Sequence, residues 1–152
     1  MPLDALKQQI SEVSLQEEKL VILVGRPGSG KSRILRRLSN NNYLDLSKEL
    51  TKKLLPFARE KRVALAPAML QEIFDSREEA VVIMDNIEIL FLPELDLDPL
   101  TVLTKLSREK TLVVAWVGGY DGSRLSWSEP GRPGYKAFDL DKWNFPVILI
   151  ED

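Results

Sequence analysis

The chain has 152 residues, of which 44% are hydrophobic and 29% are charged, and its formal net charge is -2 at pH 7. We therefore expect one globular domain over residues 1–152, large enough to form a hydrophobic core. The small negative charge argues against a general nucleic-acid-binding surface. The sequence contains no Cys and no His, which excludes disulfides, thiol nucleophiles, imidazole bases and Cys/His zinc sites.

The N-terminal residues 1–7 have no positive region followed by an apolar core, so they do not resemble a secretory signal. No apolar run approaches the roughly 20 residues that cross a bilayer. Together with the absence of Cys, these features predict a cytoplasmic protein without membrane contact.

The first third of the chain predicts a helix, a strand and a second helix. The first helix has apolar residues at steps of three and four: Leu3, Leu6, Ile10 and Val13. We expect it to cover the domain, with contact to the base of a nucleotide as the alternative. Residues 20–24 are a continuous apolar run, typical of a central parallel strand. A helix is expected from Lys31 to Ser39, and a turn at 40–42.

The middle of the chain predicts a short strand at 43–46 and a helix that Ser47 caps and that ends near Leu55. Residues 57–65 are expected to be partly helical, and Pro67 to begin a helix that ends at Phe74. Basic residues are densest here: Lys52, Lys53, Arg59, Lys61 and Arg62. We interpret them as a solvated face, with contact to a partner or nucleic acid as the alternative.

The second half predicts a buried strand at 80–85 that ends in a carboxylate, and a helix at 99–108 that Asp98 caps. Strands are expected at 111–117 and 147–150. Residues 118–135 are rich in turn residues and are expected to form a long functional or mobile loop. Strands that alternate with helices predict an α/β fold with a mostly parallel sheet in three layers.

Residues 25–32, GRPGSGKS, match the full G-x-x-x-x-G-K-[ST] motif between an apolar strand and a helix. Glycines let the backbone of such a loop curl, so that successive N–H groups form an anion nest. Lys31 is expected to reach the β- and γ-phosphates of ATP, and the Ser32 hydroxyl to ligate Mg²⁺. The predicted nucleotide-binding residues are Gly25, Pro27, Gly28, Ser29, Gly30, Lys31, Ser32 and Arg33.

Asp85 ends an apolar strand, as does the magnesium-binding Asp of P-loop NTPases, so Ser32 and Asp85 are the predicted metal residues. We expect Asp85 to hold the metal through water. In the additional-strand ATPases a Glu commonly follows this Asp directly, whereas this chain has Asn86 there and Glu88 two residues later. Glu88 could orient the attacking water if the strand continues past Asp85. Alternatively, Glu88 only begins a helix, and turnover is slow or absent.

Charge that develops on the γ-phosphoryl group is often stabilised by an arginine finger. Arg124 is our first candidate and Arg132 the second, both in the segment after the 111–117 strand. The polar sensor residue expected near the end of that strand is not evident. The predicted catalytic residues are Lys31, Asp85, Glu88 and Arg124.

Three parts of the sequence, GRPGSGKS, VVIMDNIEIL, and AWVGGYDGSRLSW with the following EPGRPGY, resemble the small P-loop protein of BREX phage-defence systems. The resemblance covers most of the chain, and residues 116–135 are its most discriminating part. It implies a three-layer P-loop NTPase fold with an AAA+-like core that lacks a C-terminal helical lid. It also implies a bacterial cytoplasmic protein that binds ATP beside larger defence proteins, including a DNA methyltransferase. Without a lid, ring or partner contacts would complete the site.

The leading hypothesis is therefore a protein that binds Mg·ATP and acts as a nucleotide-dependent switch or weak ATPase. One alternative is a small-molecule phosphotransferase, in which residues 118–135 close over a substrate. Another is a non-catalytic adaptor that binds DNA or protein. The expected partners are ATP or ADP and other defence proteins. A homo-oligomer and weak or indirect DNA contact stay open, and no membrane contact is expected.

Overall fold

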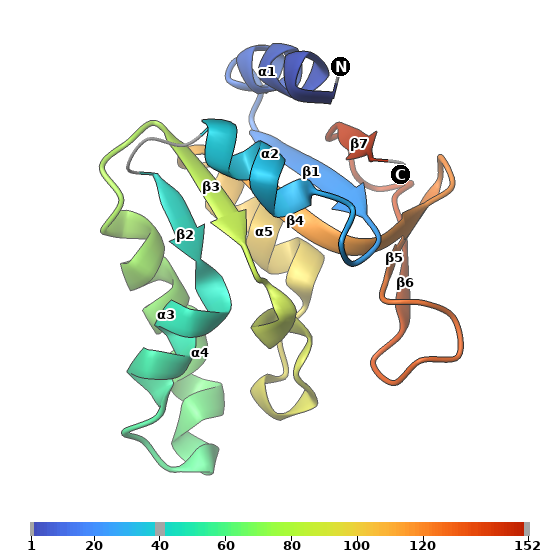
Figure 1. Cartoon of the computed structure of the whole chain (residues 1–152). Coiled ribbons are helices and arrows are strands. Elements are labelled where there is room, and N and C mark those ends of the chain that lie inside the picture. The colour runs from blue at the N-terminus through green and yellow to red at the C-terminus, as the bar shows by residue number, and fades with distance from the viewer. Residues whose placement is uncertain (1, 39–41, 151–152) are drawn as a thin grey trace.

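The computed structural model describes residues 2–38 and 42–150, and its centre is a parallel sheet (Figure 1). Five strands lie in the order β2-β3-β4-β1-β7, and each neighbouring pair is parallel. In that order the strands are β2 (Tyr43–Asp45), β3 (Val81–Asp85), β4 (Thr111–Tyr120), β1 (Leu20–Gly25) and β7 (Val147–Leu149). The predicted α/β fold with a mostly parallel sheet is confirmed.

Strand β1 lies inside the sheet because its whole length is apolar and it is covered on both faces. All six of its residues are buried. Leu20 pairs with Leu112 of β4, and Ile22 pairs with both Val114 of β4 and Val147 of β7. This pairing fixes the end of β1, and hence the start of the glycine-rich loop.

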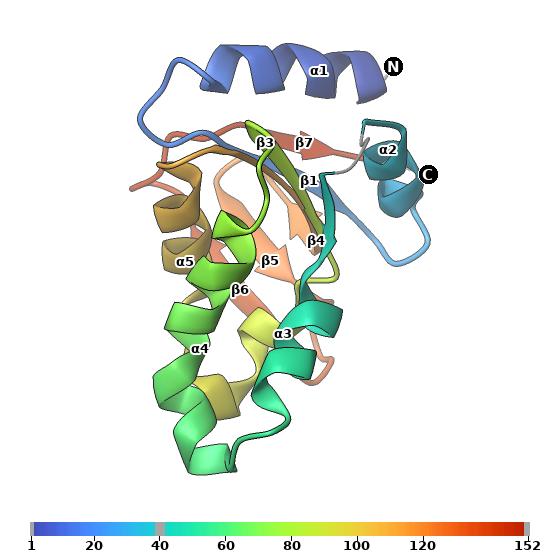
Figure 2. The same cartoon turned by 90° about the vertical axis from the view of Figure 1, so that its left-hand side faces the viewer.

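Helices cover both faces of the sheet and form two hydrophobic cores (Figure 2). On one face lie α1 (Pro2–Val13) and α2 (Lys31–Leu38), so the predicted covering role of the first helix is confirmed. The other face carries α3 (Leu46–Leu54), α4 (Arg59–Asp75), α5 (Pro99–Ser107) and two 3₁₀ helices, η1 (Glu88–Phe91) and η2 (Pro93–Leu95). The predicted helix end at Ser39 and the first two residues of the turn at 40–42 lie outside the described residues.

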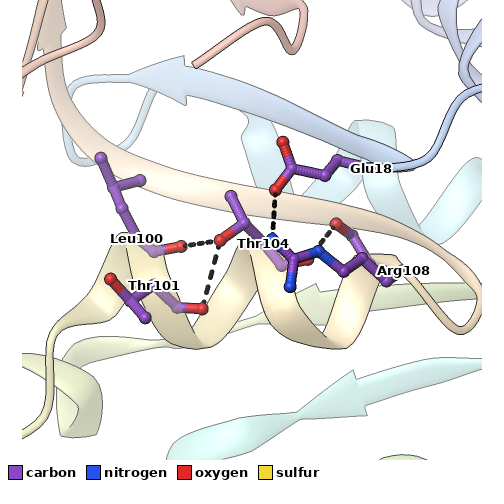
Figure 3. A network of polar contacts seen from close by, with 6 residues as sticks. Glu18, Leu100, Thr101, Thr104 and Arg108 are labelled. Atoms are coloured by element: carbon purple, nitrogen blue, oxygen red, sulfur yellow. Dashed lines mark hydrogen bonds and ion pairs between the residues drawn. The ribbon is translucent and has the colours of Figure 1, made fainter. Parts of the chain in front are cut away.

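The segment that leads into β1 is tied to the end of α5 (Figure 3). Arg108 forms an ion pair with Glu18 at 3.3 Å, and the ammonium of Lys19 donates to the carbonyl of Arg108 at 3.0 Å. Inside α5, the Thr104 hydroxyl donates to the carbonyl of Leu100 at 2.8 Å, which satisfies a buried polar group within its own helix. The bonds of Arg108 to Glu18 and Lys19 fix the point at which the chain enters β1.

Two predicted helix starts are wrong, and the first concerns α3. Leu46 is helical, and Asp45 is the N-cap; its carboxylate accepts the Lys48 N–H at 3.1 Å. A carboxylate at this position reaches the third amide of the helix, so Ser47 is not needed as a cap. The hydroxyl of Ser47 bonds elsewhere, as described below.

The second wrong start is Pro67, which lies inside the continuous helix α4. A proline in a helix interior removes one hydrogen bond and costs about 3 kcal/mol. Here the ring is on the exposed side, where water can bond the freed carbonyl of Val63, itself an exposed residue. The same helix buries Leu70 and Phe74 in the core, and this burial outweighs the loss.

The loop predicted at 118–135 is wrong for residues 118–127, which form a β-hairpin, whereas residues 128–135 form no helix or strand, as predicted. Strand β4 continues to Tyr120 and pairs antiparallel with β5 (Arg124–Trp127), which pairs with β6 (Lys136–Asp139). The sequence signal is Asp121-Gly122, a hairpin dipeptide. The carboxylate of Asp121 accepts the N–H groups of Ser123 and Arg124, and these bonds lower its pKa.

Aromatic packing fastens this hairpin to the core. The rings of Phe91 and Trp127 stack with centroids 3.9 Å apart, and Trp116 meets both of them edge to face. The indole N–H of Trp116 donates to the carbonyl of Ser126 at 2.8 Å. The hairpin is therefore a fixed extension of β4 rather than a free loop.

Gly118 is the point of closest approach between β4 and β5. A Cβ atom at this position would lie 1.8 Å from the backbone oxygen of Ser126, which cannot move without breaking the strand pairing. We expect Gly118→Ala to destabilise the fold by about 1–3 kcal/mol, a typical overpacking cost. Thermal unfolding measures the effect.

Gly119→Ala is the matched control, because a Cβ there meets only the hydroxyl of Ser126, at 3.4 Å. Equal melting temperatures for the two variants would contradict the tight contact at Gly118.

Candidate functional site

The loop between β1 and α2 has the backbone of an open anion nest. Gly28 and Gly30 have φ values of 79° and 93°, in the region that favours glycine. The N–H of Ser29 donates to the carbonyl of Arg26 at 3.1 Å, whereas no backbone carbonyl of the described residues accepts from Gly28, Gly30 or Ser32. These amides lie at the N-terminus of α2, where the helix dipole favours an anion.

The side chain of Lys31 crosses the loop, and groups of the loop are its hydrogen-bond partners. Its side chain is buried, with 6% of its surface exposed. The ammonium donates to the carbonyls of Gly25 at 2.9 Å and Arg26 at 2.7 Å, and to the hydroxyl of Ser29 at 3.0 Å. A buried cation needs such partners, since an unpaired one would be costly. The loop therefore holds a positive charge beside its amides.

Asp85 receives three hydrogen bonds at the end of β3. Its Oδ2 accepts the hydroxyl of Ser32 at 2.7 Å, and its Oδ1 accepts the backbone N–H of Asn86 at 2.8 Å. The carboxylate is 5% exposed. The Ser32 bond joins the first turn of α2 to a strand that is separated from β1 by β4. The two residues predicted as metal partners thus lie in direct contact.

Tyr43, which the sequence reasoning missed, donates the third bond. Its hydroxyl lies 2.6 Å from Oδ2 of Asp85. Burial, followed by the hydrogen bond and charge of Asp85, raises the pKa of Tyr43 to about 12, although Arg36 beside its ring acts in the opposite direction. The phenol therefore stays protonated at physiological pH and is a permanent donor. No local sequence signal marks this residue, because its role depends on the pairing of β2 with β3.

Glu88 lies near this carboxylate, although not on a strand. Strand β3 ends at Asp85, Asn86 has a φ of 54°, and Glu88 begins η1, so the predicted strand continuation is wrong. The alternative, a helix start, is the observed local structure. The hydroxyl of Ser47 lies 3.0 Å from Oε2 of Glu88 and 2.5 Å from the carbonyl of Asn86. Ser47 was expected as a helix cap and instead ties α3 to this turn.

A cleft of about 330 Å³ brings these groups together. Its walls come from the loop, the turn after β3, β4 and β5. Gly25 contributes indirectly, because its carbonyl accepts a hydrogen bond from the ammonium of Lys31. The sequence-predicted residues that line it are Pro27, Gly28, Ser29, Gly30, Lys31, Ser32, Arg33, Asp85 and Glu88.

The structure does not bring Arg124 to this cleft. Arg124 is exposed on β5, opposite Asp139 of β6, and lines none of the cavities beside the loop. Arg132, the second candidate, lines a neighbouring cavity and lies 3.8 Å from Glu129. Within the described part of the chain, Arg33 is the one arginine that lines the cleft.

The basic residues of α3 and α4 have partly structural roles. Lys53 forms an ion pair with Glu72 at 3.1 Å. The guanidinium of Arg62 donates to the carbonyls of Phe57 at 2.8 Å and Leu54 at 3.1 Å, at the end of α3. Bonds to the last carbonyls of a helix favour a cation there. Nucleic-acid contact by this region stays a prediction.

The described residues contain no cluster of three or more acidic side chains that could enclose a metal ion. A cation between Ser32 and Asp85 would take its remaining oxygen ligands from water or phosphate, as Mg²⁺ commonly does. Across 2–38 and 42–150, no helix is both long enough and apolar enough to cross a membrane.

No protein-family model and no curated protein matches this sequence. The chemistry of the cleft is therefore the basis on which a function can be proposed.

Proposed function

We propose that this protein binds Mg·ATP in the cleft and acts as a nucleotide-dependent switch or weak ATPase. The observation that carries the proposal is the 2.7 Å bond from Ser32 to Asp85, beside a nest of amides and a buried lysine. Each part has a separate reason to exist in a protein that binds a triphosphate. Their convergence at one helix N-terminus is what favours this function over a structural turn.

The loop supplies the groups that phosphates require. Backbone N–H groups of Gly28, Gly30 and Ser32 offer donors without side-chain entropy, and the N-terminal end of α2 adds a positive potential. The ammonium of Lys31 bonds to carbonyls of the same loop, so it can reach a phosphate oxygen by exchanging partners. A bound phosphate would replace those carbonyls and neutralise the charge more completely.

The Ser32 hydroxyl fits a magnesium ligand. It donates its proton to Asp85, so its lone pairs remain available to a cation. Asp85 keeps its orientation through the bonds from Tyr43 and Asn86. This pair would hold Mg²⁺, which when bound would reduce the negative charge of the phosphates. Strand β4 between β1 and β3 matches the strand insertion that defines the additional-strand ATPases, which supports a P-loop NTPase fold with an AAA+-like core.

Two features favour slow turnover. Glu88 is the one carboxylate besides Asp85 that lines the cleft within the described residues, and it is exposed and begins a 3₁₀ helix. An exposed carboxylate that is held by the Ser47 hydroxyl at 3.0 Å orients water less firmly than one fixed by several bonds. The arginine candidates lie outside the cleft, so charge on the γ-phosphoryl group lacks one common source of stabilisation.

Removal of the loop lysine tests nucleotide binding. Lys31→Ala should raise the Kd for Mg·ADP and Mg·ATP by about 100-fold or more, because two charge-assisted hydrogen bonds of about 1.5–3 kcal/mol each are lost. Calorimetric titration measures the Kd, and circular dichroism verifies the fold. Lys52→Ala, at an exposed lysine of α3, is the control. An unchanged Kd in Lys31→Ala would defeat the proposal.

The Glu88 carboxylate should matter for chemistry rather than for binding. If the wild type hydrolyses ATP, Glu88→Gln should lower kcat by about 10²–10⁴, the range for general acid–base groups, and leave the Kd nearly unchanged. Steady-state phosphate release and calorimetry provide the two numbers. Glu94→Gln, at an exposed glutamate of η2, is the matched control. Equal kcat for both variants would remove Glu88 from the catalytic residues.

The biological setting we propose is a bacterial BREX phage-defence complex, and its support is the resemblance of residues 25–32, 81–90 and 116–135. In a defence system that encodes this chain, Lys31→Ala should raise the plating efficiency of a sensitive phage toward that of a strain without the system. Plaque counts with an immunoblot for protein level measure this. Full protection by the variant would contradict a nucleotide-dependent role in defence.

A further inference from the structure

A second cavity, of about 580 Å³, lies next to the phosphate cleft and is the larger of the two. Pro27 of the loop and Val117 of β4 line both cavities, so the cavities adjoin each other. The remaining walls come from the bend of β4, from β5 and from the turn that follows β5. A volume of this size lies within the range of small-molecule sites.

The hairpin gives this cavity a rigid wall. Side chains alternate along β5: Leu125 and Trp127 are buried in the aromatic core, and Ser126 faces the cavity from the other side of the strand. Because Gly118 has no Cβ, β4 can approach the Ser126 carbonyl of β5 closely. The Ser128 N–H donates to the carbonyl of Val117 at 2.9 Å and closes the end of the pairing. The wall is therefore preformed.

The polar groups around the cavity favour an anion. Two arginines line the cavity, Arg26 from the glycine-rich loop and Arg132 from the turn after β5. The lining includes one carboxylate, that of Glu129. The hydroxyls of Ser126 and Ser128 add neutral hydrogen-bonding groups. Guanidinium groups bind phosphate through two parallel N–H bonds, and both arginines are exposed, so the side chains can turn toward a ligand.

The position of the cavity is defined relative to the bound nucleotide, and this step rests on the proposed function. A magnesium ion held by Ser32 and Asp85 would lie beside the outer phosphates of a bound triphosphate, so this pair would mark the γ-phosphate end of the cleft. Strand β4 runs between the loop and Asp85, and the cavity adjoins the cleft through Val117 of this strand. Arg33, further along α2, lines the cleft but not the cavity.

We propose that this cavity binds a second small molecule, of nucleotide size and bearing a phosphate monoester, beside the γ-phosphate end of the bound nucleotide. The loop contributes to both sites, with its amides and Lys31 in one and Arg26 in the other. A small-molecule phosphotransferase, the alternative function, needs an acceptor pocket, and no sequence motif marks one. A molecule in this cavity would lie next to the γ-phosphate, the group on which a transferase or an allosteric switch would act.

The test uses protein saturated with Mg·ADP and five probes: AMP, GMP, CMP, UMP and ribose 5-phosphate. We expect at least one probe to bind with a Kd below about 1 mM in calorimetry. Arg132→Glu should weaken that probe by about tenfold or more, since a bidentate phosphate contact is lost and repulsion is added. Arg124→Glu is the matched control, because it makes the same charge change on β5, the strand that precedes the turn with Arg132, but outside both cavities.

The outcomes separate this inference from the proposed function. If Mg·ADP binds and no probe does, or if both arginine variants bind the probe equally, the second site is wrong and the nucleotide site stands. If Arg132→Glu weakens Mg·ADP itself, the cavity holds part of that nucleotide, and the inference is also wrong. If Mg·ADP does not bind the wild type, the proposed function fails first.

Discussion

The hydrogen bond between Ser32 and Asp85 is the interaction on which the site depends. It joins the first turn of α2 to the end of β3, two points that are 53 residues apart in the sequence and separated in the sheet by β4. The bond forms only if β1 and β3 end near one level, which their parallel pairing with β4 provides. Hydrophobic pairing in the centre of the sheet thus determines the geometry of polar groups at its edge.

The same constraint explains the surrounding bonds. Asp85 is nearly buried, and a buried carboxylate needs donors; Ser32, Tyr43 and Asn86 supply them. Lys31 is likewise buried and takes its partners from the loop. The charged groups are therefore satisfied within the protein and yet lie beside open amides. A ligand with phosphates and a cation could exchange with these internal bonds, which is the physical basis for a switch.

Local sequence signals predicted the parts of the fold that depend on local chemistry. The sequence alone showed the glycine-rich loop before Lys31 and Ser32. It also showed the apolar runs of the buried strands and Asp85 at the end of one of them. Tyr43 and Ser47 were missed as site residues because they reach the site through the pairing of β2 with β3 and the packing of α3. The β5 strand was missed because the glycines at 118 and 119 suggested a turn, whereas both pair with β5 and Gly118 permits close strand contact. Pro67 was misplaced because tertiary burial outweighed its local preference.

We propose that Ser32 and Asp85 mark the metal position of a nucleotide site. A crystal structure with a non-hydrolysable ATP analogue and Mn²⁺, with anomalous differences to locate the metal, measures this directly. We expect a metal peak beside the Ser32 hydroxyl, within one water of the Asp85 carboxylate, and phosphate oxygens on the amides of Gly28 and Gly30. A nucleotide bound elsewhere, or a metal that touches neither residue, would contradict this assignment.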